Sequence, residues 1–357
     1  MIEGNVPKYI KPVWDLWRDG ISFSLLNKFL MCRHQCYLSY VAGWTPKRFS
    51  LPLEFGSAVH HVIEEIAWVD GKACIKTIPT ILNYYLVDLR KTLHNYSSVV
   101  EEVLSMLSLV EIVMPLYFDH WAKQDSKMQW VGREAGFSQK IEIHPHVPEC
   151  MSTEIKLRGK IDGVYSLGRK PIWLFETKTK GKIDELGIQY SLPYDTQTLI
   201  YAVAAKMIWE RNVSGVLYNV IRRPGLRLGK TESQDAFYER VKKDIKSRPS
   251  HYFHRWQVSF PRNHVERFRF RQLEPMLEEL VRWYLGFCKP NKAGGKPNRL
   301  VNLPLDPFGN PHHFLTGSAL MSQWGRCDMF EPITHHNYSG VYRRKVAHQE
   351  LQPGDKV

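Results

Sequence analysis

Three charged side chains near the middle of the chain have the types and spacing that suit metal-assisted chemistry. Asp162 stands toward the end of one alternating segment, and Glu176 and Lys178 stand toward the end of the next. Residues 157–165 and 172–179 each alternate apolar and polar side chains, which predicts two β-strands, and the Gly and Pro residues between them predict a hairpin turn. If the strands pair, the two carboxylates and the ammonium group converge.

Two carboxylates beside a lysine are suited to bind Mg²⁺ and to act on a phosphate group. Mg²⁺ takes one or two carboxylates and keeps several waters, which leaves positions for a substrate phosphate. The lysine can hold or deprotonate the attacking water and offset the charge that develops at the phosphate. An edge hairpin whose charges form a surface ion pair gives the same pattern, and the three residues alone do not decide between the two interpretations.

The composition of the chain indicates a globular protein with a polyanionic partner. Its 357 residues carry a net charge of +13, and 43% of them are hydrophobic. This charge favours nucleic acid first and a membrane surface second, although a basic protein without such a ligand has the same composition. No apolar run is long enough to span a bilayer, and the N-terminus lacks the layout of a signal peptide. We therefore expect a cytoplasmic or nuclear protein whose six cysteines are reduced thiols.

An apolar pattern at helical spacing begins beside Ser22, which is in position to cap the first predicted helix. The pattern continues toward Tyr40, and Gly43 is a suitable end. Cys32 and Cys36 lie four residues apart within it. They can share a metal with other ligands, but core or surface thiols are the commoner outcome.

A second helix is predicted over residues 58–67. His60 and Glu64 are one turn apart on it and share a face. On local grounds, a lone histidine here is a hydrogen-bonded residue more often than a metal ligand. Gly56, four residues before His60, would let the backbone approach another element closely.

A further helix and a further strand are predicted after the hairpin. Residues 191–211 form an amphipathic helix that carries Gln197 and Tyr201 one turn apart, on the rim of its buried face. Gln197 can bond a phosphate or a water, and Tyr201 can stack or donate its hydroxyl, although a plain helix rim looks the same. Residues 213–221 are a further strand. Four basic residues flank these elements and can contact a phosphate backbone: Lys180, Lys182, Arg222 and Arg223.

Of the remaining segments, residues 75–125 are predicted to be scaffold. Residues 75–125 have long helical patterning without a site, and residues 130–143 are a strand with Glu134 on its polar face. Beyond residue 225, helices at 237–245 and 265–288 alternate with turn-rich loops. Arginine and phenylalanine mix around the start of the second of these helices, which suits a nucleic-acid groove or a solvated basic helix face equally.

The order of these elements resembles the PD-(D/E)xK nuclease superfamily, and specifically its RecB-like branch. Five short stretches carry the likeness, over roughly residues 20 to 220. Each is modest alone, but all five in the right order make a specific signal, because the motifs and the predicted order of helices and strands agree independently. Isoleucine precedes Asp162 where the family name has proline, which is usual in the RecB-like branch. The stretches that carry the likeness are residues 22–32, 55–60, 159–163, 176–178 and 197–201.

For the fold, the resemblance implies an α/β, restriction-endonuclease-like core, in which a mixed central β-sheet is flanked by helices, with added helical segments. The implied core spans residues 20–225 with a helical insertion at about 70–125, and residues 226–357 form a helical, loop-rich extension that can contact DNA. The implied activity is a metal-dependent deoxyribonuclease, an exonuclease in DNA recombination, repair or degradation. The alternative is a nuclease-fold subunit of a larger recombination complex that binds DNA without cutting it. A homo-oligomer or a recombination-protein partner is compatible with either.

Carried over residue by residue, the resemblance also implies a metal site. Asp162 and Glu176 would bind Mg²⁺, with Mn²⁺ as a substitute, and His60 would be a further ligand or would orient one. Glu134 would match an acidic position in the strand before the aspartate motif, and Glu64 shares the helix face of His60.

The resemblance gives the remaining site residues roles around that metal. Lys178 would position and activate the attacking water, and Gln197 and Tyr201 would contact DNA or brace the site. Some relatives hold an iron–sulfur cluster with one cysteine near the first helix and three grouped near the C-terminus. Here Cys32 occupies the first position, but only Cys288 and Cys327 lie downstream, far apart. We therefore do not expect an iron–sulfur cluster.

Overall fold

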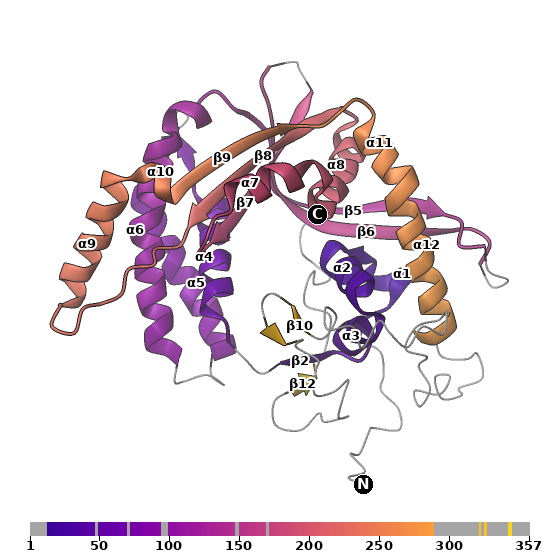
Figure 1. Ribbon diagram of the computed structural model, residues 1–357, viewed down its shortest axis with the longest axis horizontal. Helices are drawn as coiled ribbons and strands as arrows, with labels where there is room; N and C mark the ends of the chain where they lie inside the picture. Colours follow the sequence, from indigo (N-terminus) through magenta and orange to yellow (C-terminus); the bar gives the residue numbers. More distant parts are fainter. Residues whose placement is uncertain are drawn as a thin grey trace, which may run out of the picture. The chain divides into compact units, whose positions relative to one another are not determined.

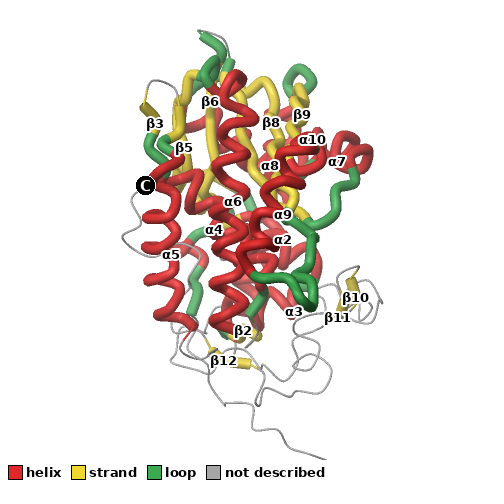
Figure 2. Tube along the Cα trace, turned by 90° about the vertical axis from the view of Figure 1, so that its left-hand side faces the viewer, coloured by secondary structure: helices red, strands yellow, loops and turns green. Residues whose placement is uncertain are grey.

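The computed structural model describes residues 13–46, 49–69, 72–93, 99–146, 150–168 and 171–288, and three short strands beyond residue 320 (Figures 1 and 2). The described residues divide into two compact units. Unit 1 contains those within residues 1–48, 136–159 and 263–357, and unit 2 contains those within residues 49–135 and 160–262. None of the helices in the described part is long and apolar enough to cross a membrane.

A mixed six-stranded sheet forms the centre of the fold, as predicted. Its strands are β1 (Ile21–Ser22), β5 (Gln129–Ile143), β6 (Thr153–Ser166), β7 (Ile172–Lys180), β8 (Val213–Arg222) and β9 (Phe253–Ser259). Their order is β1-β6-β7-β8-β9, with β5 paired to β6. The pairs β1–β6 and β7–β8 are parallel, whereas β6–β7 and β8–β9 are antiparallel. The α/β fold class expected from the sequence is therefore confirmed.

The predicted hairpin is present as β6 and β7. Its register places Gly163 opposite Phe175. Gly168 in the turn has a φ of +82°, a left-handed conformation that glycine adopts at no steric cost. Because side chains alternate along each strand, Asp162 and Glu176 project close together at one end of this pairing, as the sequence indicated.

Helices cover both faces of the part of the sheet in unit 2 (Figures 1 and 2). α8 (Thr196–Trp209) connects β7 to the parallel strand β8 and packs on both. On the opposite face lie α4 (Leu51–Glu65), α6 (Val100–Asp125) and α9 (Gln234–Ser247), and α5 (Ile78–Leu93) packs against α4 and α6. Apolar side chains of this helical layer form one core with Ile221 of β8 and Phe253 of β9. α5 and α6 are the helical segment predicted between residues 75 and 125.

A buried polar network joins the sheet to the helical layer. Arg255 of β9 donates to both carboxylate oxygens of Asp125 on α6, at 2.5 and 3.2 Å, and to the hydroxyl of Tyr117 at 2.8 Å. It also donates to the side-chain oxygen of Asn219 on β8 at 3.0 Å, and Asn219 donates to Thr177 Oγ1 on β7 at 3.2 Å. The Arg255 and Asp125 side chains are only 2% and 4% exposed, so each charge depends on the other for compensation.

The first predicted helix is interrupted. Ser22 caps its start as expected, but α2 (Phe23–Met31) ends at Cys32, whose backbone is extended. Two short helical segments follow, α3 (Arg33–Cys36) and a π-helix (Tyr37–Val41). Apolar residues continue at helical spacing across the break, so their periodicity did not reveal it.

The second predicted helix begins earlier than expected. α4 starts at Leu51, seven residues before the predicted start, so Gly56 lies inside the helix rather than before it. A Cβ atom at Gly56 would lie 2.9 Å from Thr179 Oγ1 of β7. Glycine therefore permits the close approach of α4 to the strand that the sequence suggested, and this approach brings His60 to the sheet.

The helix predicted over residues 191–211 begins five residues later than expected, at Thr196. α7 (Glu185–Ser191) occupies part of the segment predicted as loop, and a 3₁₀ turn (Leu192–Tyr194) follows. α8 then begins after Asp195, whose side chain accepts from the Thr198 amide at 2.8 Å. The apolar pattern continues on both sides of Asp195, which is why the start of the helix was predicted too early. The side chain of Asp195 caps α8 and so determines where the helix begins.

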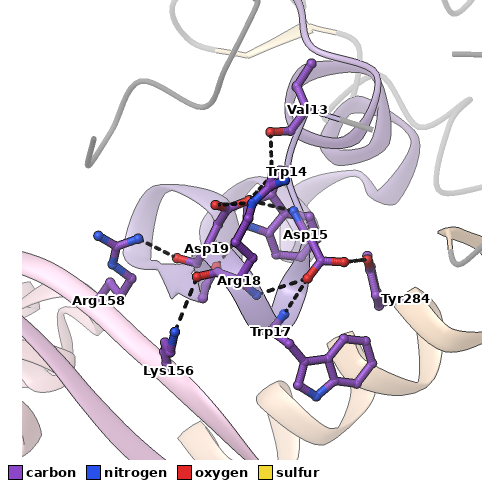
Figure 3. A network of polar contacts seen from close by, with 10 residues as sticks. Val13, Trp14, Asp15, Trp17, Arg18, Asp19, Lys156, Arg158 and Tyr284 are labelled. Carbon is purple, nitrogen blue, oxygen red and sulfur yellow. Dashed lines mark hydrogen bonds and ion pairs between the residues drawn. The ribbon is translucent and has the colours of Figure 1, made fainter. Parts of the chain in front are cut away.

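Unit 1 joins segments that are far apart in the sequence (Figure 3). The side chain of Asp15 caps α1 (Leu16–Asp19), and Tyr284, which follows α12 (Glu274–Trp283), donates its hydroxyl to Asp15 at 2.7 Å. Arg158 of β6 donates to the carbonyl oxygen of Asp19 at 2.9 Å. Residues beyond 225, interpreted from the sequence as an extension, thus contribute to both units, because β9 also belongs to the sheet of unit 2.

The other elements in the described part of the chain are short. They are β2 (Trp44–Pro46), β3 (Trp68–Val69), β4 (Lys72–Ala73), a 3₁₀ turn (Ile75–Thr77), α10 (Pro249–Tyr252), α11 (His264–Phe268), two π-helices (Arg269–Leu273 and Tyr284–Cys288), β10 (Met321–Ser322), β11 (Gly325–Arg326) and β12 (Tyr342–Arg344). The helix predicted over residues 265–288 is therefore present, with two π-helical segments inside it.

Candidate metal site and catalytic centre

A histidine and two carboxylates from three elements of unit 2 meet beside the hairpin. They are His60 of α4, Glu134 of β5 and Asp162 of β6, and one possible ligand atom of each lies within 4.8 Å of the other two. His60 Nδ1 is 3.7 Å from Glu134 Oε1 and 3.7 Å from Asp162 Oδ1. Two ligands of one Mg²⁺ ion lie at most about 4.2 Å apart, because each is about 2.1 Å from the ion. The three side chains therefore fit a small divalent cation with little rearrangement.

Glu134 has two features that mark a functional position. Its φ of +42° is left-handed within a strand, a conformation that costs about 1–3 kcal/mol for a residue other than glycine. Its side chain is 6% exposed, and its Oε1 atom is buried without a hydrogen-bond partner among the described residues. A buried carboxylate oxygen is rarely left unsatisfied. The unsatisfied oxygen faces His60, where a metal ion would satisfy it.

Asp162 is held in place from the neighbouring strand. Its Oδ2 atom accepts a hydrogen bond from the backbone amide of Thr177 at 2.7 Å, and its Oδ1 atom faces His60. The Thr177 side chain is on the opposite face of β7, where Asn219 donates to it at 3.2 Å. Hydrogen bonds to a metal-binding carboxylate fix its orientation. The Arg255 network thus supports the strand whose amide holds Asp162.

Lys178 is at the centre of a second set of contacts, on the face of β7 that α8 covers. Its ammonium group lies 2.5 Å from Glu176 Oε1 and donates to Gln197 Oε1 at 3.1 Å. Gln197 in turn donates to the hydroxyl of Tyr201 at 3.0 Å. The four residues singled out from the sequence therefore form one connected chain. In this arrangement Glu176 contacts Lys178 and is not one of the three side chains grouped around His60.

The pKa values of Glu176, Asp162 and His60 are all raised in the absence of a metal, so a cation that binds here must displace protons from these groups. Burial raises the pKa of Glu176 to about 7, and the nearby Asp162 carboxylate adds to the rise. Burial also raises the pKa of Asp162, and it outweighs the opposing effect of His60. The pKa of His60 is itself raised although burial lowers it, because the Glu134 and Asp162 carboxylates face the ring. A divalent cation would let these buried carboxylates stay ionised.

Replacing Glu176 with glutamine should change how the stability of the metal-free protein depends on pH. The raised pKa of Glu176 means that folding favours the neutral acid. This contribution to stability is complete below the unfolded pKa of 4.5 and is lost as the pH rises through about 7. Glutamine does not titrate, so the stability of Glu176→Gln relative to wild type should rise by roughly 2–3 kcal/mol between about pH 5 and about pH 8. Urea unfolding of both proteins in the presence of a chelator, at several pH values, measures this difference in the free energy of unfolding. A difference that does not depend on pH would contradict the raised pKa of Glu176.

Lys160 is a residue of the site that the sequence analysis did not single out. Its ammonium group lies 3.1 Å from Glu134 Oε2 and 2.7 Å from Glu64 Oε2. Glu64 thus reaches the site through Lys160 and not beside His60. The signal that could have found Lys160 is strand alternation, because it is two residues before Asp162 and so shares its face.

The predicted basic residues gather at the ends of the two parallel strands. Lys180 of β7 is opposite Arg222 of β8, and the amide of Arg223 donates to the Lys180 carbonyl at 2.9 Å. Lys182 follows in the exposed connection to α7. Lys180 and Lys182 follow Lys178 within four residues, and Arg222 and Arg223 lie at the neighbouring end of β8, so the four positive charges lie near the end of β7 that carries Lys178.

The cysteines of unit 1 give no sign of a shared metal within the described residues. Cys32 and Cys36 are both buried, and the Cys36 thiol donates to the Leu25 carbonyl oxygen at 3.8 Å. Of the two downstream cysteines considered for an iron–sulfur cluster, Cys327 lies outside the described residues, and the side chain of Cys288 is not among those described. The expectation that there is no such cluster therefore stays a prediction.

Comparison with known proteins places this geometry in a family. The family model of the PD-(D/E)XK nuclease superfamily matches residues 20–283. A comparison with curated proteins gives no match. Among solved structures, the crystal structure of SSO0001 is 13% identical and covers 71% of this chain and 84% of that chain, with a TM-score of 0.24, a likeness too weak to support a further conclusion. The family match covers most of the chain and includes every residue of the site, and the chain therefore belongs to the PD-(D/E)XK nuclease superfamily.

Proposed function

We propose that the protein is a divalent-metal-dependent deoxyribonuclease that hydrolyses DNA phosphodiester bonds as an exonuclease, in recombination, repair or degradation. The observation that carries the proposal is the meeting of His60, Glu134 and Asp162, together with the Lys178 ammonium group, which is close enough to act against the rise in the pKa of Asp162. A cation site next to a fixed lysine is the arrangement that phosphodiester hydrolysis needs, because negative charge builds up on the phosphate during attack by water. Membership of a nuclease superfamily supports the same activity.

The proposed metal site has three protein ligands, and the other coordination positions of a Mg²⁺ ion would be filled by water and a substrate phosphate. His60, Glu134 and Asp162 would hold Mg²⁺ or Mn²⁺, and Glu176 lies close enough to Asp162 to influence its charge. A bound cation supplies Lewis-acid stabilisation of the phosphate charge and a lowered pKa for a bound water. The two carboxylates suit Mg²⁺, while the imidazole nitrogen is a better ligand for Mn²⁺ than for Mg²⁺, so we expect both metals to support activity.

The other residues position the reactants. Lys178 would direct its ammonium group at the attacking water and the phosphate oxygens, because Glu176 and Gln197 fix it from two sides. The oxygen of the attacking water forms the new bond to phosphorus, and the water gives up a proton to the solvent. The bond from phosphorus to the leaving sugar oxygen breaks, and that oxygen takes up a proton from the solvent. Tyr201 braces Gln197 through its hydroxyl. The backbone of the DNA would be held by the basic residues at the strand ends, Lys180, Lys182, Arg222 and Arg223.

A time course of product lengths tests the activity and its exonuclease character together. Linear single-stranded and duplex DNA, each with free ends, are compared with covalently closed circles in Mg²⁺ and in Mn²⁺. We expect short products from the free-ended DNA from the earliest times, and intact circles. Cleavage of the circles would show an endonuclease instead. Salt-dependent binding without cleavage of any substrate would support the rival function, a nuclease-fold subunit that binds DNA without cutting it.

Replacing Lys160 with methionine should weaken metal binding by about 10- to 100-fold while leaving the rate at saturating metal largely unchanged. Lys160 contacts the carboxylates of Glu134 and Glu64, and loss of a partner that orients a metal ligand has effects of this size on affinity. A titration of cleavage rate against Mn²⁺ concentration measures both quantities. Lys140→Met is the matched control, because Lys140 pairs with Glu154 on an exposed part of unit 1. An unchanged Mn²⁺ requirement would contradict the role of Lys160.

A further inference from the structure

An exposed stripe of large side chains follows one side of α7 and the turn after it. Leu186, Tyr190 and Tyr194 are spaced four residues apart and are 67%, 77% and 73% exposed. The opposite side of the same segment is buried, where Ile188 and Leu192 pack on β8. α7 is therefore fixed to the sheet by one side while it presents two tyrosines on the other.

The tyrosine stripe, meaning Leu186, Tyr190 and Tyr194, lies between the parts of the chain that form the catalytic centre. It follows Lys180, the last residue of β7, and the connection that carries Lys182, and it precedes Gln197, which contacts Lys178. Tyr194 is three residues before Gln197, so their Cα atoms are at most about 11 Å apart. A strand of nucleic acid whose phosphate lies at Lys178 would therefore pass within reach of the stripe.

The acidic residues near the stripe keep their negative charges but make contacts within the protein. Asp184 accepts from the Gly187 amide at 3.0 Å, and Asp195 accepts from the Thr198 amide at 2.8 Å. Glu185 lies 3.6 Å from a ring nitrogen of His254. Lys182, by contrast, is exposed in the connection that leads to α7. The segment thus combines exposed aromatic rings with a nearby cation, which is the combination that binds unpaired nucleic-acid strands.

We propose that the tyrosine stripe binds the bases of a single-stranded segment of nucleic acid next to the catalytic centre, with Tyr190 and Tyr194 stacking on successive bases. This assignment rests on the proposed nuclease function, which it narrows to substrates with an unpaired strand at the site of cleavage. Bases in a duplex stack on each other and do not offer their faces to a protein, whereas unpaired bases do. Stacking tolerates any base, so the stripe would bind without sequence preference.

Binding measurements in full-length Asp162→Asn protein test the stripe without cleavage of the probe. Fluorescence anisotropy gives the Kd for labelled oligo(dT) of about 20 nucleotides and for a blunt hairpin duplex of similar charge. The variants are Tyr190→Ala, Tyr194→Ala, the double alanine variant, and the corresponding phenylalanine variants. Tyr84→Ala is the matched control, because Tyr84 is 67% exposed on α5 of the same unit and has no place in the proposal.

Each alanine variant should bind oligo(dT) at least about fivefold more weakly, since base–aromatic stacking has effects of this size or larger. The Kd of the phenylalanine variants and of Tyr84→Ala for oligo(dT) should stay within about twofold of that of the parent protein. The Kd of every variant for the hairpin duplex should also stay within about twofold of the parent value. The slope of log Kd against log salt concentration should not change, because a stacking contact releases no counterions.

Four results would overturn the stripe as a base-binding surface. The first is an unchanged affinity of the double alanine variant for oligo(dT), and the second is an equal loss of affinity for the duplex. The third is a loss of oligo(dT) affinity in the phenylalanine variants as large as that in the alanine variants. The fourth is a change in the molar mass of the double alanine variant, measured by light scattering. The last would identify the stripe as an interface between copies of the chain. Cleavage by the unmodified protein is measured separately. Tyrosine-dependent binding without cleavage would refute only the proposed nuclease function, and cleavage without tyrosine-dependent binding would refute only the proposed role of the stripe.

Discussion

Cleavage of DNA should fall by at least about 10³-fold when Asp162 is replaced with asparagine, which corresponds to about 4 kcal/mol of lost transition-state stabilisation. Asp162 faces His60 with one oxygen and accepts the Thr177 amide with the other. Asparagine keeps the shape but removes the charge, and a neutral amide is a poor ligand for Mg²⁺ or Mn²⁺. Initial rates on labelled linear DNA at saturating Mn²⁺ measure the effect.

The control for this experiment is an acidic residue of the same unit that lies outside both candidate metal groups. Asp119→Asn changes one exposed carboxylate of α6 and should leave the rate within about twofold of wild type. Urea unfolding of Asp162→Asn checks that the variant is folded. Cleavage within tenfold of wild type by a folded Asp162→Asn protein would remove Asp162 from the metal site and would withdraw the proposed mechanism.

The largest loss of stability should come from Arg255→Met, about 3–5 kcal/mol in the free energy of unfolding. Arg255 is the buried partner of Asp125, and methionine has a similar length but no charge. Removing one member of a buried ion pair leaves the other charge without compensation, and losses of this size are typical. Tyr117 and Asn219 would also each lose a hydrogen bond from the guanidinium group. Urea or guanidinium unfolding monitored by tryptophan fluorescence gives the difference.

A double variant separates the unpaired charge from the lost packing. If the unpaired Asp125 carboxylate causes most of the loss, Asp125→Asn combined with Arg255→Met should be more stable than Arg255→Met alone. A double variant that is less stable than Arg255→Met would show that the carboxylate finds other partners in the single variant. Because Asn219 links Arg255 to Thr177, and the amide of Thr177 holds Asp162, we also expect the single variant to cut DNA more slowly than wild type when both are fully folded.

The hairpin and its charged residues could be predicted because they depend on local rules. Strand alternation gave the faces of Glu176 and Lys178, and the spacing of one helical turn gave the pairing of Gln197 with Tyr201. Capping by Ser22 was also a local signal, and the structure confirms it. Such features depend on a few neighbouring residues, whose geometry is fixed by the period of the strand or helix.

The grouping around the metal could be predicted only in part, because it depends on contacts between distant segments. His60 and Glu134 are 74 residues apart, a difference of their sequence numbers, and meet only because α4 approaches the sheet at Gly56. The sequence indicated Glu134 only as a minor candidate for the metal site, yet it faces His60 more directly than Glu176 does. The break at Cys32 and the start of α8 were not predicted for a related reason. The apolar periodicity continues across both positions, whereas the helix ends at an extended residue in the first case and begins at a capping residue in the second.

The left-handed backbone of Glu134 has a consequence for how this protein would change over time. Glycine or asparagine at this position would relieve the strained conformation and remove a buried acidic oxygen that lacks a partner, so either should favour the folded state of the empty protein. A descendant that kept the fold but no longer needed to hold a cation would gain from such a replacement. We expect position 134 to be among the first to drift in a lineage whose members have lost the ability to cut.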